Sequence, residues 1–163
     1  MKSKILMLLL LLYLLFVTVT GCSKIPCAEY LKQPTENIVE INLVFEQDFE
    51  KRYVLHTFTD EEPNALDDFL EKALELSMYK HREPVAPIGY LAIDISYKDG
   101  SVQVLGSDSC KYTSAHDPDN VEFDSWHYMS YSAMHELFSQ YIDKDVLSSM
   151  RNASRNTEVG APS

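Results

Sequence analysis

The sequence has little of the residues on which several kinds of functional site depend. Only five of its 163 residues are glycine, which leaves no room for a glycine-rich loop that binds phosphate groups. Lysine and arginine together number 14 against 25 aspartate and glutamate residues, for a formal net charge of −11. Nucleic-acid binding depends on clustered basic side chains, so this balance argues against a nucleic-acid partner.

Cysteine is equally scarce, with Cys22, Cys27 and Cys110 as its three positions. Cys27 and Cys110 could form a disulfide closing a loop of about 84 residues, worth roughly 4–5 kcal/mol on the chain-entropy model. Cys110 could instead act as a nucleophile beside a histidine that folding brings near it, provided that a basic neighbour lowers its thiol pKa. The sequence leaves both interpretations open.

Motifs of catalytic and metal sites are also missing. The chain has neither a Gly-x-Ser-x-Gly motif nor a Ser-x-x-Lys motif with its partner motifs. Between His116 and Asp124 an acidic stretch could offer oxygen ligands, but it lacks the glycine and glutamate positions of an EF-hand loop. We therefore expect a solvated acidic turn there, no cofactor, and no enzyme activity. Structural or surface roles are expected for the five histidines, which are His56, His81, His116, His127 and His135.

The first residues of the chain are its most informative stretch. Lys2 and Lys4 precede an almost unbroken apolar run from Ile5 to Val19, and small residues and Cys22 follow. This order is typical of a secretory signal peptide. The apolar run is shorter than the ~20 residues that a membrane-spanning helix needs, which favours removal of the segment over permanent spanning.

The tetrad Val19-Thr20-Gly21-Cys22 resembles the lipobox of bacterial lipoproteins. In that family the cysteine receives a diacylglycerol and the chain is cut before it. The resemblance implies a signal peptide at 1–21, lipidation of Cys22, and an anchor on the outer face of the cell membrane. Tyr97 to Gly100 and Leu137 to Tyr141 also resemble the hairpin and closing helix of small Gram-positive lipoproteins, a likeness that implies no activity.

Composition divides the remaining chain into three parts. Residues 22–36 carry prolines and scattered polar side chains without a period, which predicts a tether. Residues 37–148 form the expected folded domain. Residues 149–163 have few large apolar side chains to offset the entropy of ordering, and we expect a disordered tail.

Periodicity within that domain predicts strands and two amphipathic helices. The strands are expected around Val39–Phe45, Lys51–Thr59, Leu91–Tyr97, Val102–Leu105 and Phe123–Met129, with Asp99-Gly100 as a tight hairpin turn. Cys110–Thr113 either extends a strand or adds one. Helices are expected at 62–79, with Pro63 in the first turn, and at 131–143, with Leu70 and Phe138 central on their buried stripes. The predicted fold is α+β, an antiparallel sheet with two helices on one face in the order β-β-α-β-β-β-α.

Aromatic residues in the second half of the chain suggest a binding surface. Tyr90, Trp126 and Tyr128 could form an aromatic platform for a sugar or peptide, if helices leave one face of the sheet uncovered. Cross-strand packing of aromatic side chains is the alternative. The function that the sequence favours is a membrane-anchored binding or interaction module, whose ligand is a protein, peptide or carbohydrate. The alternative is an extracytoplasmic enzyme that uses Cys110 with a histidine.

Overall fold

Most elements of the chain are strands, with short helices between some of them and two helices at the end. The computed structural model describes residues 24–48, 51–80 and 89–158. In chain order the elements are β1 (Ile25–Pro26), α2 (Cys27–Tyr30), the 3-10 helix η1 (Thr35–Asn37), β2 (Ile38–Asp48), β3 (Lys51–Thr59), α3 (Pro63–Leu74), β4 (Ser77–Lys80), β5 (Tyr90–Tyr97), β6 (Val102–Gly106), β7 (Cys110–Ser114), β8 (Asp117–Asp124), β9 (His127–Met129), α4 (Tyr131–Phe138) and α5 (Lys144–Glu158).

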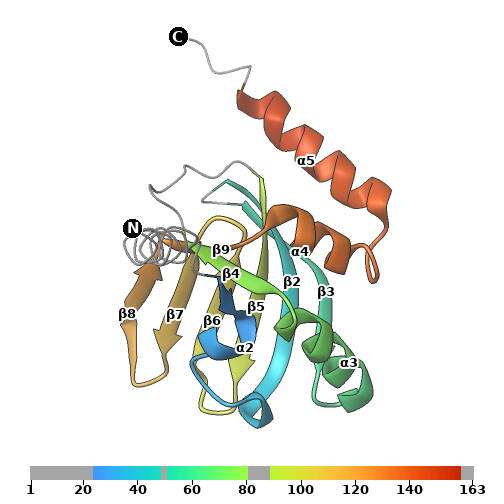
Figure 1. The fold of residues 1–163 in the computed structure, drawn as a ribbon. Coiled ribbons are helices and arrows are strands. Elements are labelled where there is room, and N and C mark those ends of the chain that lie inside the picture. Colours follow the sequence, from blue (N-terminus) through green and yellow to red (C-terminus); the bar gives the residue numbers. More distant parts are fainter. Residues whose placement is uncertain (1–23, 49–50, 81–88, 159–163) are drawn as a thin grey trace, which may run out of the picture.

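The strands form two sheets. A six-stranded sheet has the order β3-β2-β5-β6-β7-β8, and a three-stranded sheet has the order β1-β4-β9. The small sheet and α2 lie across one face of the large sheet in Figure 1. The α+β class is therefore correct, but the expected single sheet with two helices on one face is not confirmed, because a second sheet takes part in covering the first.

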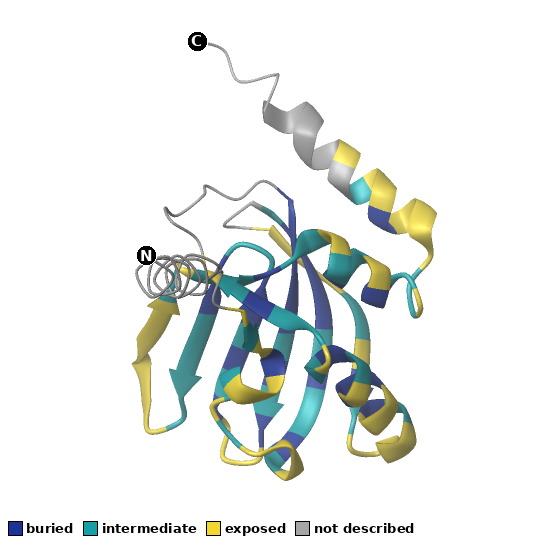
Figure 2. Ribbon diagram, in the orientation of Figure 1, coloured by how far each residue is buried: buried dark blue, intermediate teal, exposed yellow. Residues whose placement is uncertain are grey.

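The core lies on the inner face of the central strands. Along β2 the alternating residues Ile41, Leu43 and Phe45 are at most 1% exposed. They share one core with the buried residues of α3, α4 and the small sheet, which explains the dark central strands of Figure 2. Leu70 and Phe138 are 8% and 0% exposed, so their predicted burial is confirmed.

Local sequence signals predicted the two hairpins well. β2 and β3 pair as expected, and β5 and β6 are joined by the turn at Asp99-Gly100. Gly100 has a φ of +85°, a conformation that side-chain-bearing residues rarely adopt. Its amide donates to the Tyr97 carbonyl at 2.9 Å, and the Asp99 side chain accepts from the Ser101 amide at 2.9 Å. The Asp99-Gly100 pair therefore correctly predicted the turn of this hairpin.

The predicted helix at 62–79 is wrong at its end. Pro63 begins α3 as expected, but α3 ends at Leu74, and residues 77–80 form β4 instead. Met78 pairs with Met129 of β9, and both side chains are fully buried. A strand partner about 50 residues away along the chain thus overrides the local helical period.

The strand predicted at Phe123–Met129 is divided between the two sheets. β8 ends at Asp124 and β9 begins at His127, so Trp126 lies between strands. β8 also begins at Asp117, inside the segment expected to be a solvated acidic turn. The short connection from β8 to β9 transfers the chain from the large sheet to the small one.

Both predicted ends of the folded domain are also wrong. The expected tether includes β1 and α2, where Cys27 is 1% exposed and its amide donates to the Leu76 carbonyl at 2.9 Å. The second predicted helix ends early, at Phe138, and α5 then occupies much of the predicted tail. Leu147 of α5 is 1% exposed and belongs to the core. The predicted signal peptide at 1–21 lies outside the described residues. Within the described part of the chain, no helix has the length and apolar character needed to cross a membrane.

We predict that Phe138→Ala lowers the free energy of unfolding by about 3–5 kcal/mol, because it leaves a cavity in a fully buried site. Urea unfolding followed by tryptophan fluorescence measures this change. Val146→Ala is the control, because Val146 is 41% exposed and its truncation should change stability by less than about 0.5 kcal/mol. Equal losses in the two variants would contradict the core described above.

Candidate functional site

A cavity of about 570 Å³ opens where α2, the β7–β8 hairpin and the end of the small sheet meet. We call it the Asp124 cavity, after the carboxylate at its centre. Its lining residues combine aromatic, cationic and acidic side chains. They are Tyr30, Lys32, Lys80, Gln103, Cys110, Lys111, Tyr112, Glu122, Phe123, Asp124, Trp126 and His127.

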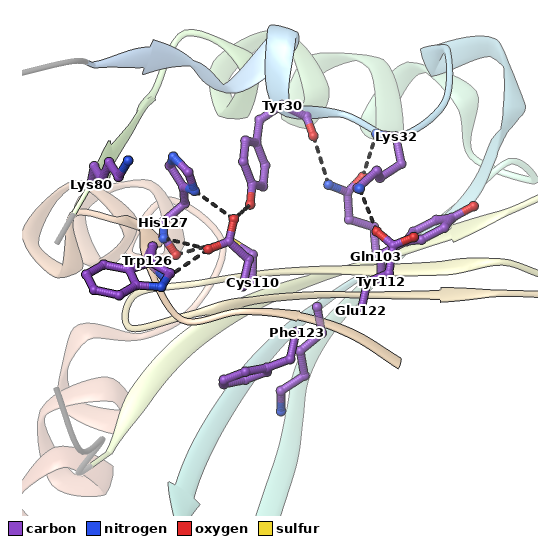
Figure 3. A pocket seen from close by; sticks show the side chains of 12 residues that line it. Tyr30, Lys32, Lys80, Gln103, Cys110, Tyr112, Glu122, Phe123, Trp126 and His127 are labelled. Atoms are coloured by element: carbon purple, nitrogen blue, oxygen red, sulfur yellow. Dashed lines mark hydrogen bonds and ion pairs between the residues drawn. The ribbon is translucent and has the colours of Figure 1, made fainter. Parts of the chain in front are cut away.

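Strand alternation decides which of these side chains face α2. Cys110 and Tyr112 alternate with Lys111 along β7, and Glu122 and Asp124 alternate with Phe123 along β8. Figure 3 accordingly places Phe123 on the opposite side of the strands from Tyr30 and Gln103. Lys111 lies over the Phe123 ring on that side, with 6.0 Å between its ammonium nitrogen and the ring centroid.

Asp124 accepts hydrogen bonds on both carboxylate oxygens. Its Oδ2 atom accepts from the Tyr30 hydroxyl at 2.6 Å and lies 2.6 Å from His127 Nδ1. Its Oδ1 atom accepts from the backbone amides of Trp126 at 2.8 Å and His127 at 3.1 Å. One carboxylate thereby fixes residues of α2, of β9 and of the connection between β8 and β9 (Figure 3).

These hydrogen bonds keep Asp124 ionised. Burial by itself would raise the pKa of its carboxyl group, but the hydrogen bonds from Tyr30, His127 and the two amides outweigh burial and lower the pKa to about 2. Because the carboxylate is an acceptor, a neutral His127 carries its proton on Nδ1, which leaves Nε2 as a hydrogen-bond acceptor. No residue of the described segments bonds to that Nε2 atom.

A buried glutamine holds the α2 end of the cavity in place. Gln103 is 1% exposed, and its Oε1 atom accepts from the Lys32 amide at 2.9 Å and the Tyr97 hydroxyl at 2.7 Å. Its Nε2 atom donates to the Tyr30 carbonyl at 3.0 Å. The Lys32 ammonium group forms a 2.8 Å ion pair with Glu122 at the rim. Because Gln103 is buried, its side-chain amide needs these hydrogen bonds, since an unpaired amide inside the protein lowers the stability of the fold.

The cavity also brings Lys80 beside His127. These residues are opposite each other in the β4–β9 pairing, so their side chains lie on the same face of the small sheet. Met78 and Met129 lie on that face too, within the core. The inner face of the small sheet therefore changes from apolar to polar where it reaches the cavity.

The predicted aromatic platform is not formed. Of its three residues only Trp126 lines the cavity, where it is 45% exposed. Tyr90 is 5% exposed and pairs with Glu46 on the opposite face of the large sheet, beside the Arg52–Glu46 ion pair. Tyr128 points away from the cavity because it alternates with His127 in β9, and it contacts the Tyr79 ring. The prediction assumed one continuous strand across Trp126, and the chain bends there instead.

The two described cysteines are free and buried thiols, so the disulfide that the sequence left open is not formed between them. Burial raises the pKa of each thiol to about 12. Cys110 does meet a histidine, but its sulfur donates to the backbone carbonyl of His127 at 3.5 Å. At neutral pH the sulfur is therefore protonated, whereas nucleophilic catalysis requires a thiolate.

Sequence reasoning missed most of the cavity. Tyr30 and Lys32 fall in the segment expected to be a tether, and Lys80 in one expected to follow a helix. The spacing Asp124-x-x-His127 was visible in the sequence, but nothing there indicated that Tyr30 joins the pair. Within the described segments, no group of three or more histidine, cysteine, aspartate or glutamate side chains is arranged to hold a metal ion.

Compared with protein-family models, with curated proteins and with solved structures, the chain matches none. The cavity itself is therefore the basis for a functional proposal.

We predict that Asp124→Asn destabilises the protein at neutral pH, because it replaces an ionised acceptor of several hydrogen bonds. The pKa of Asp124 is lowered on folding from 3.8 to about 2, so its contribution is present above about pH 4 and is lost as the pH falls toward 2. Thermal unfolding from pH 7 to pH 2 should show the two midpoints converging below pH 4.

The control for this series is Asp119→Asn, which removes an exposed carboxylate from the same strand. Its midpoint should follow the wild type throughout the pH range. A constant gap between wild type and Asp124→Asn down to pH 2 would show that the ionised carboxylate is not the source of the stability.

Proposed function

We propose that the protein is a lipid-anchored extracytoplasmic binding module whose ligand occupies the Asp124 cavity. The observation that carries the proposal is the set of side chains in this cavity. The carboxylate of Asp124 fixes Tyr30, His127 and the backbone at Trp126, while Lys80, the Trp126 ring and His127 Nε2 have no partners among the described residues. A largely preformed cavity that combines aromatic rings with a few polar groups is typical of ligand sites.

Aromatic and polar groups are both available to a ligand there. Tyr30, Tyr112 and Trp126 supply rings, while the Lys32–Glu122 pair at the rim supplies hydrogen-bonding groups. A volume of about 570 Å³ lies within the roughly 300–1,000 Å³ common for small-molecule sites. The cavity thus suits a small ligand or the end of a larger one.

Binding is better supported than thiol catalysis. A thiol-dependent enzyme that uses Cys110 with a histidine was the alternative from the sequence. The only histidine contact that Cys110 makes in the described segments is with a backbone carbonyl, and burial raises its thiol pKa to about 12. Neither property helps to generate a thiolate nucleophile.

The anchor part of the proposal depends on the resemblance of Val19-Thr20-Gly21-Cys22 to a lipobox. These residues lie outside the described segments. Two acyl chains on Cys22 would bind a membrane firmly, because each buried CH₂ group contributes about 0.8 kcal/mol and one chain alone binds only marginally. The acidic chain itself has little attraction for an anionic lipid surface.

Trp126 offers a direct test of binding, because it is the only tryptophan of the chain and lines the cavity. The full chain in detergent is titrated with an array of defined oligosaccharides and short peptides while acrylamide quenches the fluorescence. A ligand in the cavity should shield the indole, and we expect the quenching constant to fall at least twofold at saturation.

The matched control places the fluorescent indole on the other side of the small sheet. In the double variant Trp126→Phe, Tyr128→Trp the indole lies beside Tyr79, away from the cavity. A cavity ligand should not shield it there. Equal shielding at both positions would mean nonspecific adsorption, and an array without any shielding ligand would contradict the binding function.

The anchor is tested with Cys22→Ala. This change should abolish lipidation and leave a precursor that still carries residues 1–21, because the lipid acceptor is missing. Mass spectrometry of the wild-type protein from membranes should show an acylated Cys22 at its N-terminus. Intact residues 1–21 on the mature wild-type protein would refute the anchor, without bearing on the cavity.

A further inference from the structure

We propose that the Asp124 cavity binds an acidic sugar, whose carboxylate pairs with Lys80 while its ring packs against Trp126. This inference rests on the proposed binding function and specifies its ligand.

Of the cations that the described residues contribute to the cavity, Lys80 is the one that remains available to a ligand. The ammonium group of Lys32 is paired with Glu122 at 2.8 Å and lies 5.4 Å from the centroid of the Tyr112 ring. Lys111 extends over Phe123 on the far side of the strands. Among the described residues no carboxylate pairs with Lys80, although the cavity contains two acidic side chains.

Those acidic side chains are already bonded. Asp124 accepts four hydrogen bonds from the protein, and Glu122 is paired with Lys32. Neither can turn to Lys80 without losing these partners. An anionic ligand could therefore be the ion-pair partner of the Lys80 ammonium group, and a carboxylate is a suitable anion for this pair.

His127 supplies an acceptor next to that cation. Lys80 and His127 are cross-strand neighbours on one face of the small sheet, as Figure 3 shows from the cavity side. Because Asp124 holds the Nδ1 proton, the Nε2 atom of the neutral ring can accept a hydroxyl proton. A cation beside a hydroxyl acceptor matches a carboxylate that stands next to hydroxyl groups, as in a uronic acid.

Trp126 supplies the surface for the sugar ring. Its side chain is 45% exposed at the cavity, while its backbone amide is held by Asp124 at 2.8 Å. The CH groups on one face of a pyranose ring form an apolar surface that can cover an indole, and the hydroxyl groups at its edge remain free for hydrogen bonding. The rim pair Lys32–Glu122 can bond such hydroxyl groups.

A sugar fits this site better than an acidic peptide does. A common way to hold an extended peptide uses the unpaired backbone groups of a sheet edge. The ligand groups identified here, in contrast, are side chains of Lys80, Trp126 and His127. The net charge of −11 also repels anions at a distance, so the selectivity must come from contacts within the cavity.

The experiment compares two disaccharides, cellobiouronic acid and cellobiose, which differ only in a carboxylate that replaces a hydroxymethyl group. Their dissociation constants are measured on the full chain in detergent by Trp126 fluorescence quenching. We expect the wild-type protein to bind the acid at least tenfold more tightly. Lys80→Gln should remove this preference while the affinity for cellobiose stays within twofold.

Lys24→Gln is the matched control, because Lys24 lies over Tyr79 on the opposite face of the small sheet. It removes the same charge from the chain and should leave the tenfold preference intact. Equal affinity of the wild type for both sugars, or a preference that survives Lys80→Gln, would overturn the proposal. Tighter binding of the dipeptide Gly-Glu than of cellobiouronic acid would overturn it as well, and would leave the binding function standing.

Discussion

The antiparallel pairing of β4 with β9 is the constraint on which the rest of the structure depends. It joins Met78 to Met129, two fully buried residues far apart in the chain, and so holds the small sheet together. The same three residue pairs end at Lys80 and His127, where the apolar core gives way to the cavity. One short ladder thus contributes to the hydrophobic core at one end and defines the candidate site at the other.

Asp124 extends this constraint to α2. Its carboxylate binds Tyr30 across a sequence separation of 94 residues and His127 across a separation of three. A carboxylate with several hydrogen-bond donors is ionised over the whole neutral range, so the arrangement does not depend on a change of protonation near pH 7. Gln103 fixes the same segment from the β6 side, and the cavity is therefore bounded by groups whose positions are largely determined before any ligand arrives.

The sequence predicted what local chemistry determines and failed where distant partners decide. The Asp99-Gly100 turn and the alternation of Ile41, Leu43 and Phe45 need only their neighbours in the chain, and both predictions are correct. Residues 77–79 fall within the predicted helix but belong to β4, because β9 pairs with this segment. Tyr30 carried no signal at all, since its role exists only through Asp124. The candidate site is assembled from such long-range contacts, which explains why only Trp126 of the predicted platform belongs to it.

The position of β1 limits how the proposed anchor can act. Ile25 is already paired with Met78, so only Ser23 and Lys24 separate Cys22 from the folded domain. The three extended Cα-to-Cα steps from Cys22 to Ile25 span at most about 11 Å, which is far shorter than the tether that composition suggested. With Cys22 lipidated, the small sheet and α2 would therefore stay next to the lipid headgroups. An acidic domain held so close to an anionic surface is repelled by it, and this repulsion favours orientations that turn the bulk of the domain, rather than its first strand, away from the membrane.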